Sequence, residues 1–289
     1  MKKVSQLAIN IFFILILLAC VLPIVLLVSI SFTSDLSIVR NGYSFIPREF
    51  SLDAYRYLWS DRDRILHSLL ITIALTVTGT VLSTMITSML AYAISRKKFV
   101  IRKGLNFVVF FSMLFNGGLV PTYIMYTQFL HVKDTFWGLL LPNLLVSGFH
   151  VMMMRTYYTS NIHDEILESA AVDGAGEFRT FFQIVMPMSV PILATVGLLS
   201  AINYSNDWYN GLIYLNKPSL FSLQNLLNRI LMDLQFLRSE NTSDGSLQNI
   251  PLESARMAMA VIGIAPILCA YPFFQRYFVK GITVGSVKG

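Results

Sequence analysis

The chain has 289 residues, of which 55% are hydrophobic and only 13% are charged, and its formal net charge is +6. A soluble domain carries about 25% charged residues, so this composition excludes an ordinary water-soluble enzyme as well as a disordered chain. In so apolar a chain, the basic excess favours loops beside a membrane over nucleic-acid binding. Cys20 and Cys269 lie in apolar runs and the histidines lack metal-ligand spacing, so neither disulfides nor a metal site is predicted.

Six apolar stretches are long enough to cross a bilayer as helices. They cover approximately residues 7–32, 65–94, 105–126, 136–154, 190–215 and 257–278. Lipid cannot satisfy an open sheet edge, so the expected fold is an all-α integral membrane protein with six transmembrane helices. We divide it into a first helix with its external loop (1–64), a core of five helices (65–278) and a C-terminal tail (279–289).

The short loop 96–103 sets the expected orientation. It carries five basic residues and no acidic one, and such loops remain in the cytoplasm. Both termini are therefore predicted to be cytoplasmic. Lys2 and Lys3 before an apolar run also fit a signal peptide, with Cys20 at its end. The apolar run continues to Phe32, however, which favours an uncleaved first span.

Two loops are then expected outside. In the first, Arg48–Tyr55 predicts a short interfacial helix capped by Ser51. In the second (216–256), apolar residues recur with helical spacing along Ser222–Leu237 and predict an amphipathic helix. The polar segment 239–249 predicts a flexible tip, and its Asn241-Thr242-Ser243 match to a glycosylation pattern carries little weight.

The cytoplasmic loop 157–188 carries five acidic residues, which a positive-inside bias does not explain. Residues 164–172 predict a helix with acids in its first turn and Asn161 as N-cap. Gly174 and Gly176 predict a turn, and a second helix is expected from Glu177 to Pro187. Small residues on this loop let another surface approach closely. An ordinary connection is the alternative, but the combination favours an interaction site.

The same loop resembles the "EAA" signature of permease subunits in binding-protein-dependent ABC importers. The matching residues are Glu168, Ser169, Ala170, Ala171, Asp173, Gly174, Ala175, Phe182, Ile184 and Pro187. Ser169 and Met186 depart from the usual Ala and Leu. Segment 206–214 and the tail from Phe278 are similar to the second, maltose-type permease of the carbohydrate-uptake branch. The chain looks closest to permeases for complex saccharides, such as alginate or lipo-oligosaccharide-type systems.

The resemblance implies a non-enzymatic permease subunit of the cell (inner) membrane that carries an oligo- or polysaccharide by alternating access. The loop would be a coupling helix, with Glu168 as its motif acid and Gly174 as its turn residue. Implied partners are a second homologous permease, two ATP-binding subunits at the loop and tail, and an extracytoplasmic solute-binding protein. ATP and Mg would be bound by those ATP-binding subunits, because this chain has no phosphate-binding loop and needs no cofactor of its own.

Polar residues inside spans are candidates for a substrate path. They are Asn203, Asn206, Asp207, Trp208, Tyr209 and Asn210 in the fifth span, with Asn116 and Tyr123 in the third. Amides, carboxylates and aromatic rings suit a sugar, but pairing with a neighbouring helix or an interfacial position explains Asp207 equally well. In span three, Gly117-Gly118-x-x-Pro121 predicts a broken helix. A permease for a peptide or another polar solute is the nearest alternative, whereas an intramembrane enzyme lacks its motifs.

Overall fold

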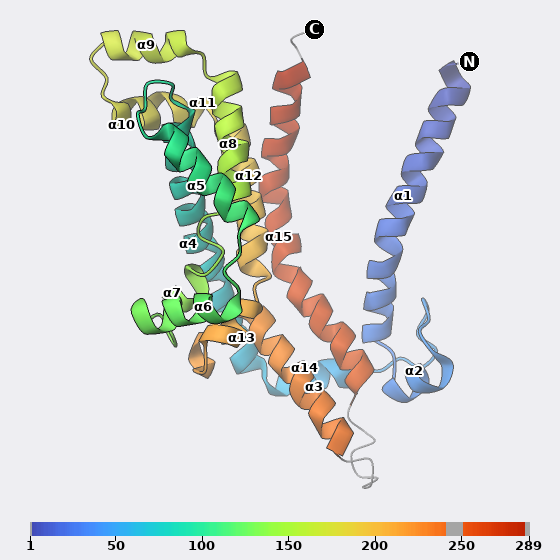
Figure 1. The fold of residues 1–289 in the computed structure, drawn as a ribbon. Coiled ribbons are helices and arrows are strands. Elements are labelled where there is room, and N and C mark those ends of the chain that lie inside the picture. Colours follow the sequence, from blue (N-terminus) through green and yellow to red (C-terminus); the bar gives the residue numbers. More distant parts are fainter. Residues whose placement is uncertain (1, 241–250, 287–289) are drawn as a thin grey trace. The chain divides into compact units, whose positions relative to one another are not determined.

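The computed structural model describes residues 2–240 and 251–286, and all of its named elements are helices (Figure 1). The expected all-α class is therefore confirmed, with one isolated antiparallel bridge between Thr33 and Phe50. The helices are α1 (Lys2–Ser31), α2 (Asp35–Asn41), α3 (Asp53–Ser60), α4 (Arg62–Ser95), α5 (Arg102–Leu114), α6 (Leu119–Ile124), η1 (Met125–Phe129), α7 (Trp137–Leu140), α8 (Gly148–Asn161), α9 (Asp164–Val172), α10 (Glu177–Thr180), η2 (Phe181–Val185), α11 (Met186–Met188), α12 (Val190–Ser205), α13 (Tyr209–Tyr214), η3 (Pro218–Leu220), α14 (Leu223–Glu240) and α15 (Leu252–Ser286).

Three single helices in the described residues are long and apolar enough to cross a membrane: Ile9–Ser31, Arg62–Ser95 and Leu252–Cys269. They correspond to the first, second and sixth expected spans. Two further pairs pass the same test together, Arg102–Leu114 with Leu119–Phe129, bent by 120°, and Glu177–Met188 with Val190–Ser205, bent by 84°. The first bend falls at Gly118, whose φ is +85°, so the predicted break in span three is confirmed.

The fourth expected span is not one helix. Residues 136–154 contain the short α7, a break over 141–147 and the start of α8, which continues to Asn161. Pro142 lacks an amide hydrogen and crowds the preceding turn, and Asn143 has a φ of +61°, so a helix cannot run through them. The fifth expected span, 190–215, is likewise divided into α12 and α13.

The chain forms two compact units, Met1–Leu66 with Leu226–Pro266 and His67–Asn225 with Ile267–Gly289. In the first unit, the expected helix near residues 48–55 begins later, as α3 at Asp53. The residue at its N-cap position is Leu52 rather than the predicted Ser51, although Ser51 Oγ accepts from the Asp53 amide at 3.0 Å. Asp35 Oδ1 accepts from the amides of Glu253 and Ser254 at the start of α15.

The second expected outer loop, residues 216–256, is only partly within the described residues. The amphipathic helix predicted over 222–237 is confirmed as α14. Most of the predicted tip, including Asn241-Thr242-Ser243, lies outside the described residues, as do residues 287–289 of the tail. The backbone of α15 continues as helix from residue 279 to Ser286.

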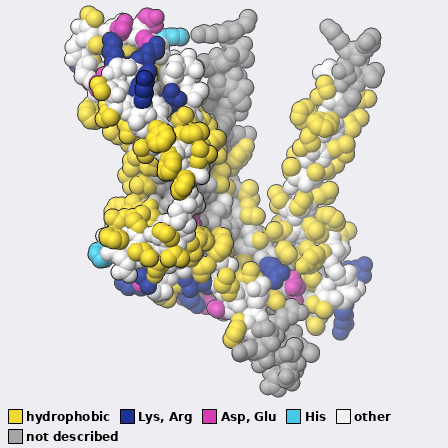
Figure 2. Space-filling view, viewed as in Figure 1, with side chains coloured by type: hydrophobic (Ala, Val, Ile, Leu, Met, Phe, Trp, Pro, Cys, Tyr) yellow, Lys and Arg dark blue, Asp and Glu magenta, His cyan; other side chains and the backbone are white. Residues whose placement is uncertain are grey.

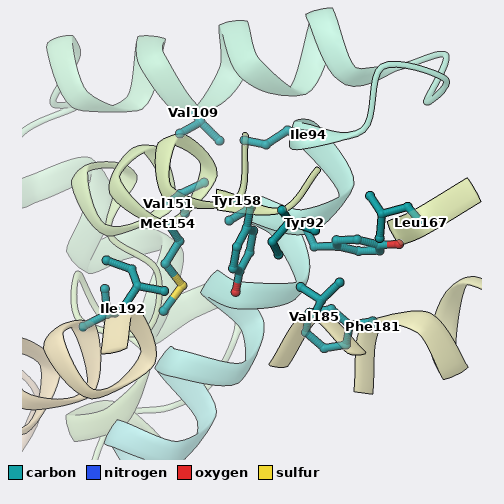
Figure 3. Packing of buried hydrophobic residues seen from close by; sticks show 13 residues of the cluster. Tyr92, Ile94, Val109, Val151, Met154, Tyr158, Leu167, Phe181, Val185 and Ile192 are labelled. Carbon is teal, nitrogen blue, oxygen red and sulfur yellow. The ribbon is translucent and has the colours of Figure 1, made fainter. Parts of the chain in front are cut away.

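In the second unit, α4, α5, α8 and α12 lie alongside one another (Figure 1). Gly79 allows the Tyr204 ring to pack against α4, because an added Cβ would lie only 2.6 Å from that ring. Tyr204 is fully buried, and its hydroxyl donates to the Leu140 carbonyl at 3.0 Å. Figure 3 shows the buried cluster near the other end of these helices, which includes Tyr92, Met154, Tyr158, Leu167 and Phe181.

Candidate functional site

The loop between α8 and α12 folds as two helical segments at one end of the second unit (Figure 1). The first is α9. The second begins at Glu177, as predicted, and runs through α10, η2 and α11 to Met188, one residue past the expected end at Pro187. Its centre is π-helical over Phe181–Val185. The sequence therefore predicted both segments, but not the π-helical turn.

The turn between the two segments depends on Gly174. This residue has a φ of +76°, the left-handed conformation that glycine adopts without steric cost. Its amide donates to the Ala171 carbonyl at 3.1 Å, and the Ala175 amide donates to the Ala170 carbonyl at 2.9 Å. These two bonds form a Schellman motif, which ends α9 sharply and satisfies its last carbonyls.

The start of α9 differs from the prediction. The residue at the N-cap position is His163, and its side chain makes no capping bond, so Asn161 is not the N-cap. Instead, the Asn161 side-chain amide donates to the Tyr157 carbonyl at 3.0 Å, at the end of α8. Asp164 and Glu165 in the first turn remain favourably placed for the helix dipole.

The loop has one buried side and one exposed side. Leu167 and Ala170 of α9, with Phe181 and Val185 of the second segment, are each at most 6% exposed and pack into the unit. Two motif residues, Ala175 and Ile184, are half-buried. The other motif residues are exposed: they are Glu168, Ser169, Ala171, Asp173, Gly174, Phe182 and Pro187. The inner residues anchor the loop, and the small and acidic outer residues remain free of the core.

Polar contacts tie the loop to the end of α4 and the residues after it. Lys97 Nζ lies 2.7 Å from Asp164 Oδ2, and Lys98 Nζ lies 3.6 Å from Glu168 Oε1. The hydrogen bond and charge of Lys97 lower the pKa of the Asp164 carboxyl, and those of Asp164 raise the pKa of Lys97. Figure 2 shows basic and acidic side chains gathered at this end, with hydrophobic ones along the bundle.

Lys97 and Lys98 were predicted from the sequence only as residues that orient the chain, and not as partners of the loop. Tyr92, whose hydroxyl donates to Glu177 Oε2 at 2.6 Å, was not predicted as a partner either. The available signal was the spacing of Asp164 and Glu168, which places two acids on one helix face, matched by two adjacent lysines in the basic loop.

The polar segment after α12 is built around Asp207. Its Oδ1 accepts from the amides of Tyr209 and Asn210, the first two residues of α13, at 3.1 and 3.2 Å. Asp207 Oδ2 is buried and has no hydrogen-bond partner among the described residues. Asn210 is 2% exposed, and its amide donates to the Pro142 carbonyl at 2.9 Å. These bonds give Asp207 and Asn210 a structural role, and their part in a substrate path stays a prediction.

Most of the remaining substrate-path candidates have exposed side chains. Asn203, Asn206, Trp208 and Tyr209 are exposed. Tyr123 stacks on Tyr214 of α13, with ring centroids 5.9 Å apart, so the structure brings the third-span candidate to this segment. The Asn116 side chain instead accepts from the Gly118 amide at 2.9 Å, within its own turn. No group of His, Cys, Asp and Glu in the described part could hold a metal ion.

Most of the all-helical fold, including the two-helix loop, lies within a segment that matches a known protein family. Residues 83–284 match the family of "Binding-protein-dependent transport system inner membrane component". The chain belongs to this family. It is a membrane component of a transport system, and the match includes the two-helix loop and the polar segment.

Individual relatives cover nearly the whole chain. The Bacillus subtilis polygalacturonan/rhamnogalacturonan transport system permease protein YtcP is 36% identical, over 96% of both chains. Protein LplC of the same organism is 34% identical over 93% of this chain and 90% of its own. A crystal structure of a bacterial ABC transporter involved in the import of the acidic polysaccharide alginate matches with a TM-score of 0.77 and 27% identity, covering 96% of this chain and 97% of that one.

Proposed function

We propose that this chain is the permease subunit of an ATP-driven importer that carries an oligo- or polysaccharide across the cytoplasmic membrane by alternating access. A solute-binding protein would deliver the saccharide from outside. The family membership supports the transport role, and the names of YtcP and of the alginate importer support the saccharide. These names favour a saccharide over a peptide or another small polar solute.

The proposed topology has six membrane crossings and both termini in the cytoplasm. Contacts of Lys97 with Asp164 and of Lys98 with Glu168 bring the basic loop 96–103 and the loop 157–188 to the same end of the second unit. The basic loop is the one that the positive-inside rule retains in the cytoplasm. The two-helix loop therefore belongs on the cytoplasmic side, where ATP is available.

The observation that carries the proposal is the division of the two-helix loop into a buried and an exposed side. Leu167 and Phe181 fix it to the unit, so a force applied outside is transmitted inward. Ala171 and Gly174 on the exposed side let a second surface approach closely. We assign this side to an ATP-binding partner subunit, with a second permease completing the path and the tail 279–289 reaching the ATP-binding subunits.

The test is saccharide-stimulated ATP hydrolysis by the whole complex in vesicles, with a binding protein added outside. Uronic oligosaccharides are the first probes, because YtcP and the alginate importer are named for such polymers. We expect Glu168→Lys to insert normally but to lose stimulation, since it reverses a charge on the exposed side. Glu165→Lys is the matched charge reversal outside the motif. Stimulation by a peptide but by no saccharide would overturn the substrate assignment.

A further inference from the structure

One tyrosine connects the second segment of the loop to α4. Tyr92 lies in the last turn of α4 and is 8% exposed. Its hydroxyl donates to Glu177 Oε2 at 2.6 Å, and its ring centroid lies 5.3 Å from that of Phe181. The Arg96 guanidinium lies 5.6 Å from the ring centroid of Tyr92. Tyr92 belongs to the same buried cluster as Leu167 of the first segment and Phe181 of the second, as Figure 3 shows.

The first segment is attached differently. The side chains of the Lys97–Asp164 pair are 72% and 53% exposed, and those of the Lys98–Glu168 pair are 85% and 64% exposed. Exposed ion pairs contribute little and are screened by salt. A hydroxyl that donates to a carboxylate makes a charge-assisted bond, which is shorter and stronger than a bond between two neutral groups. The Tyr92–Glu177 bond, whose donor is on a buried side chain, is therefore the firmer polar connection between the loop and α4.

The position of Glu177 suits it to accept the hydrogen bond from Tyr92. It is the first residue of α10, where the helix dipole favours a negative charge. The helical run that starts at Glu177 continues through Phe181 to Met188. A bond at its first residue and a ring contact one turn later fix both the position and the rotation of this segment on α4.

We propose that Tyr92 and Glu177 form a latch that positions the second segment on α4, so that displacement of the loop moves the cytoplasmic end of α4. This inference rests on the proposed role of the loop as the contact for an ATP-binding subunit. Tyr92 is a positioning residue, since it acts through the loop. Without the hydroxyl bond, the ring contact with Phe181 keeps the loop packed but lets it slide along α4.

The experiment compares two single-atom deletions in the complete complex. Tyr92→Phe removes the latch hydroxyl and keeps the ring. Tyr158→Phe is the control, because Tyr158 is also buried and its hydroxyl lies 2.6 Å from Ser88 Oγ of α4, but it lies on α8, before the two helical segments of the loop. The readouts are ATP hydrolysed per saccharide transported, thermal stability, and hydrogen–deuterium exchange of residues 177–185.

We expect Tyr92→Phe to raise both the ATP cost per saccharide and the exchange of residues 177–185 by about tenfold, the effect of losing one hydrogen bond to a charged group. Glu177→Gln keeps a weaker, neutral acceptor, so about a threefold rise is expected. Tyr158→Phe should lower thermal stability at least as much as Tyr92→Phe, but leave the ATP cost unchanged.

Equal changes in Tyr92→Phe and Tyr158→Phe would overturn the latch, because both would then act through general packing. Unchanged exchange of residues 177–185 in Tyr92→Phe would also overturn it. If the wild-type complex shows no saccharide-stimulated ATP hydrolysis, the proposed function fails instead. The exchange comparison does not need transport, so it decides the latch in that case too.

Discussion

Replacing Gly174 tests whether the sharp turn of the two-helix loop is needed for its function. Its φ of +76° is unfavourable for any residue with a Cβ, whereas the space around that Cβ is open, with no atom within 4 Å. Gly174→Ala should therefore cost only the backbone term, about 1–2 kcal/mol. That cost is a factor of about 5–30 in the equilibrium between the formed and the opened turn.

Gly176 provides a control in the same loop. An added Cβ there also meets no atom within 4 Å, but the φ of Gly176 is −71°, which alanine adopts freely. The lower entropy of the unfolded chain would favour alanine there by about 0.4–1 kcal/mol. The poorer fit of alanine at an N-cap offsets this gain. Gly176→Ala should therefore change the turn very little.

The assay is hydrogen–deuterium exchange of residues 170–180, measured beside uptake and ATP hydrolysis of the full complex. We expect faster exchange and weaker coupling in Gly174→Ala, and near wild-type values in Gly176→Ala. Gly174→Asn should lie between them, since asparagine tolerates the left-handed region better than alanine. Gly174→Pro should be the most severe, because proline fixes φ near −65°. Equal effects of the two alanine variants would refute the reasoning.

Two further predictions concern packing and pH. Gly79→Ala should destabilise the protein by about 1–3 kcal/mol, because its Cβ would lie 2.6 Å from the Tyr204 ring, whereas Gly197→Ala meets its nearest atom at 3.7 Å and should be tolerated in thermal unfolding. The Asp164–Lys97 contact lowers the pKa of Asp164 and raises that of Lys97. It should therefore be fully present between about pH 4 and pH 10. It should be lost as pH falls through the lowered pKa of Asp164 or rises through the raised pKa of Lys97, which a spin-label distance between the basic loop and α9 would detect.

Local signals made the two-helix loop predictable from the sequence. Acids in the first turn, Gly174 after nine helix-forming residues, and a second apolar run together predict helix, turn and helix. The structure has that order, with α9 ending at Val172 and α10 starting at Glu177. The break near Gly118 was predictable for the same reason, since adjacent glycines followed closely by a proline weaken a helix at that point.

Features that depend on a single residue or on residues far apart in the sequence were not predicted. A hydropathy window averages over Pro142 and Asn143, so residues 136–154 read as one span although the helix breaks there. Asparagine is a favourable N-cap residue, but the side-chain amide of Asn161 donates a hydrogen bond to the Tyr157 carbonyl instead. The Tyr92–Glu177 bond joins residues 85 positions apart, which no local pattern encodes.

The positions of the charged side chains at this end of the second unit explain how the loop is attached. Lys97 and Lys98 follow α4 directly, and Asp164 and Glu168 lie on one face of α9, so the contacts between them join two loops that the sequence keeps far apart. Each pair is exposed and therefore weak alone. Weak ionic contacts on the first segment, beside a firmer bond from Tyr92 to the second, leave α9 free to adjust to a partner while α10 stays on α4. Both properties suit the role proposed for this loop, which is to contact another subunit and to move a membrane helix.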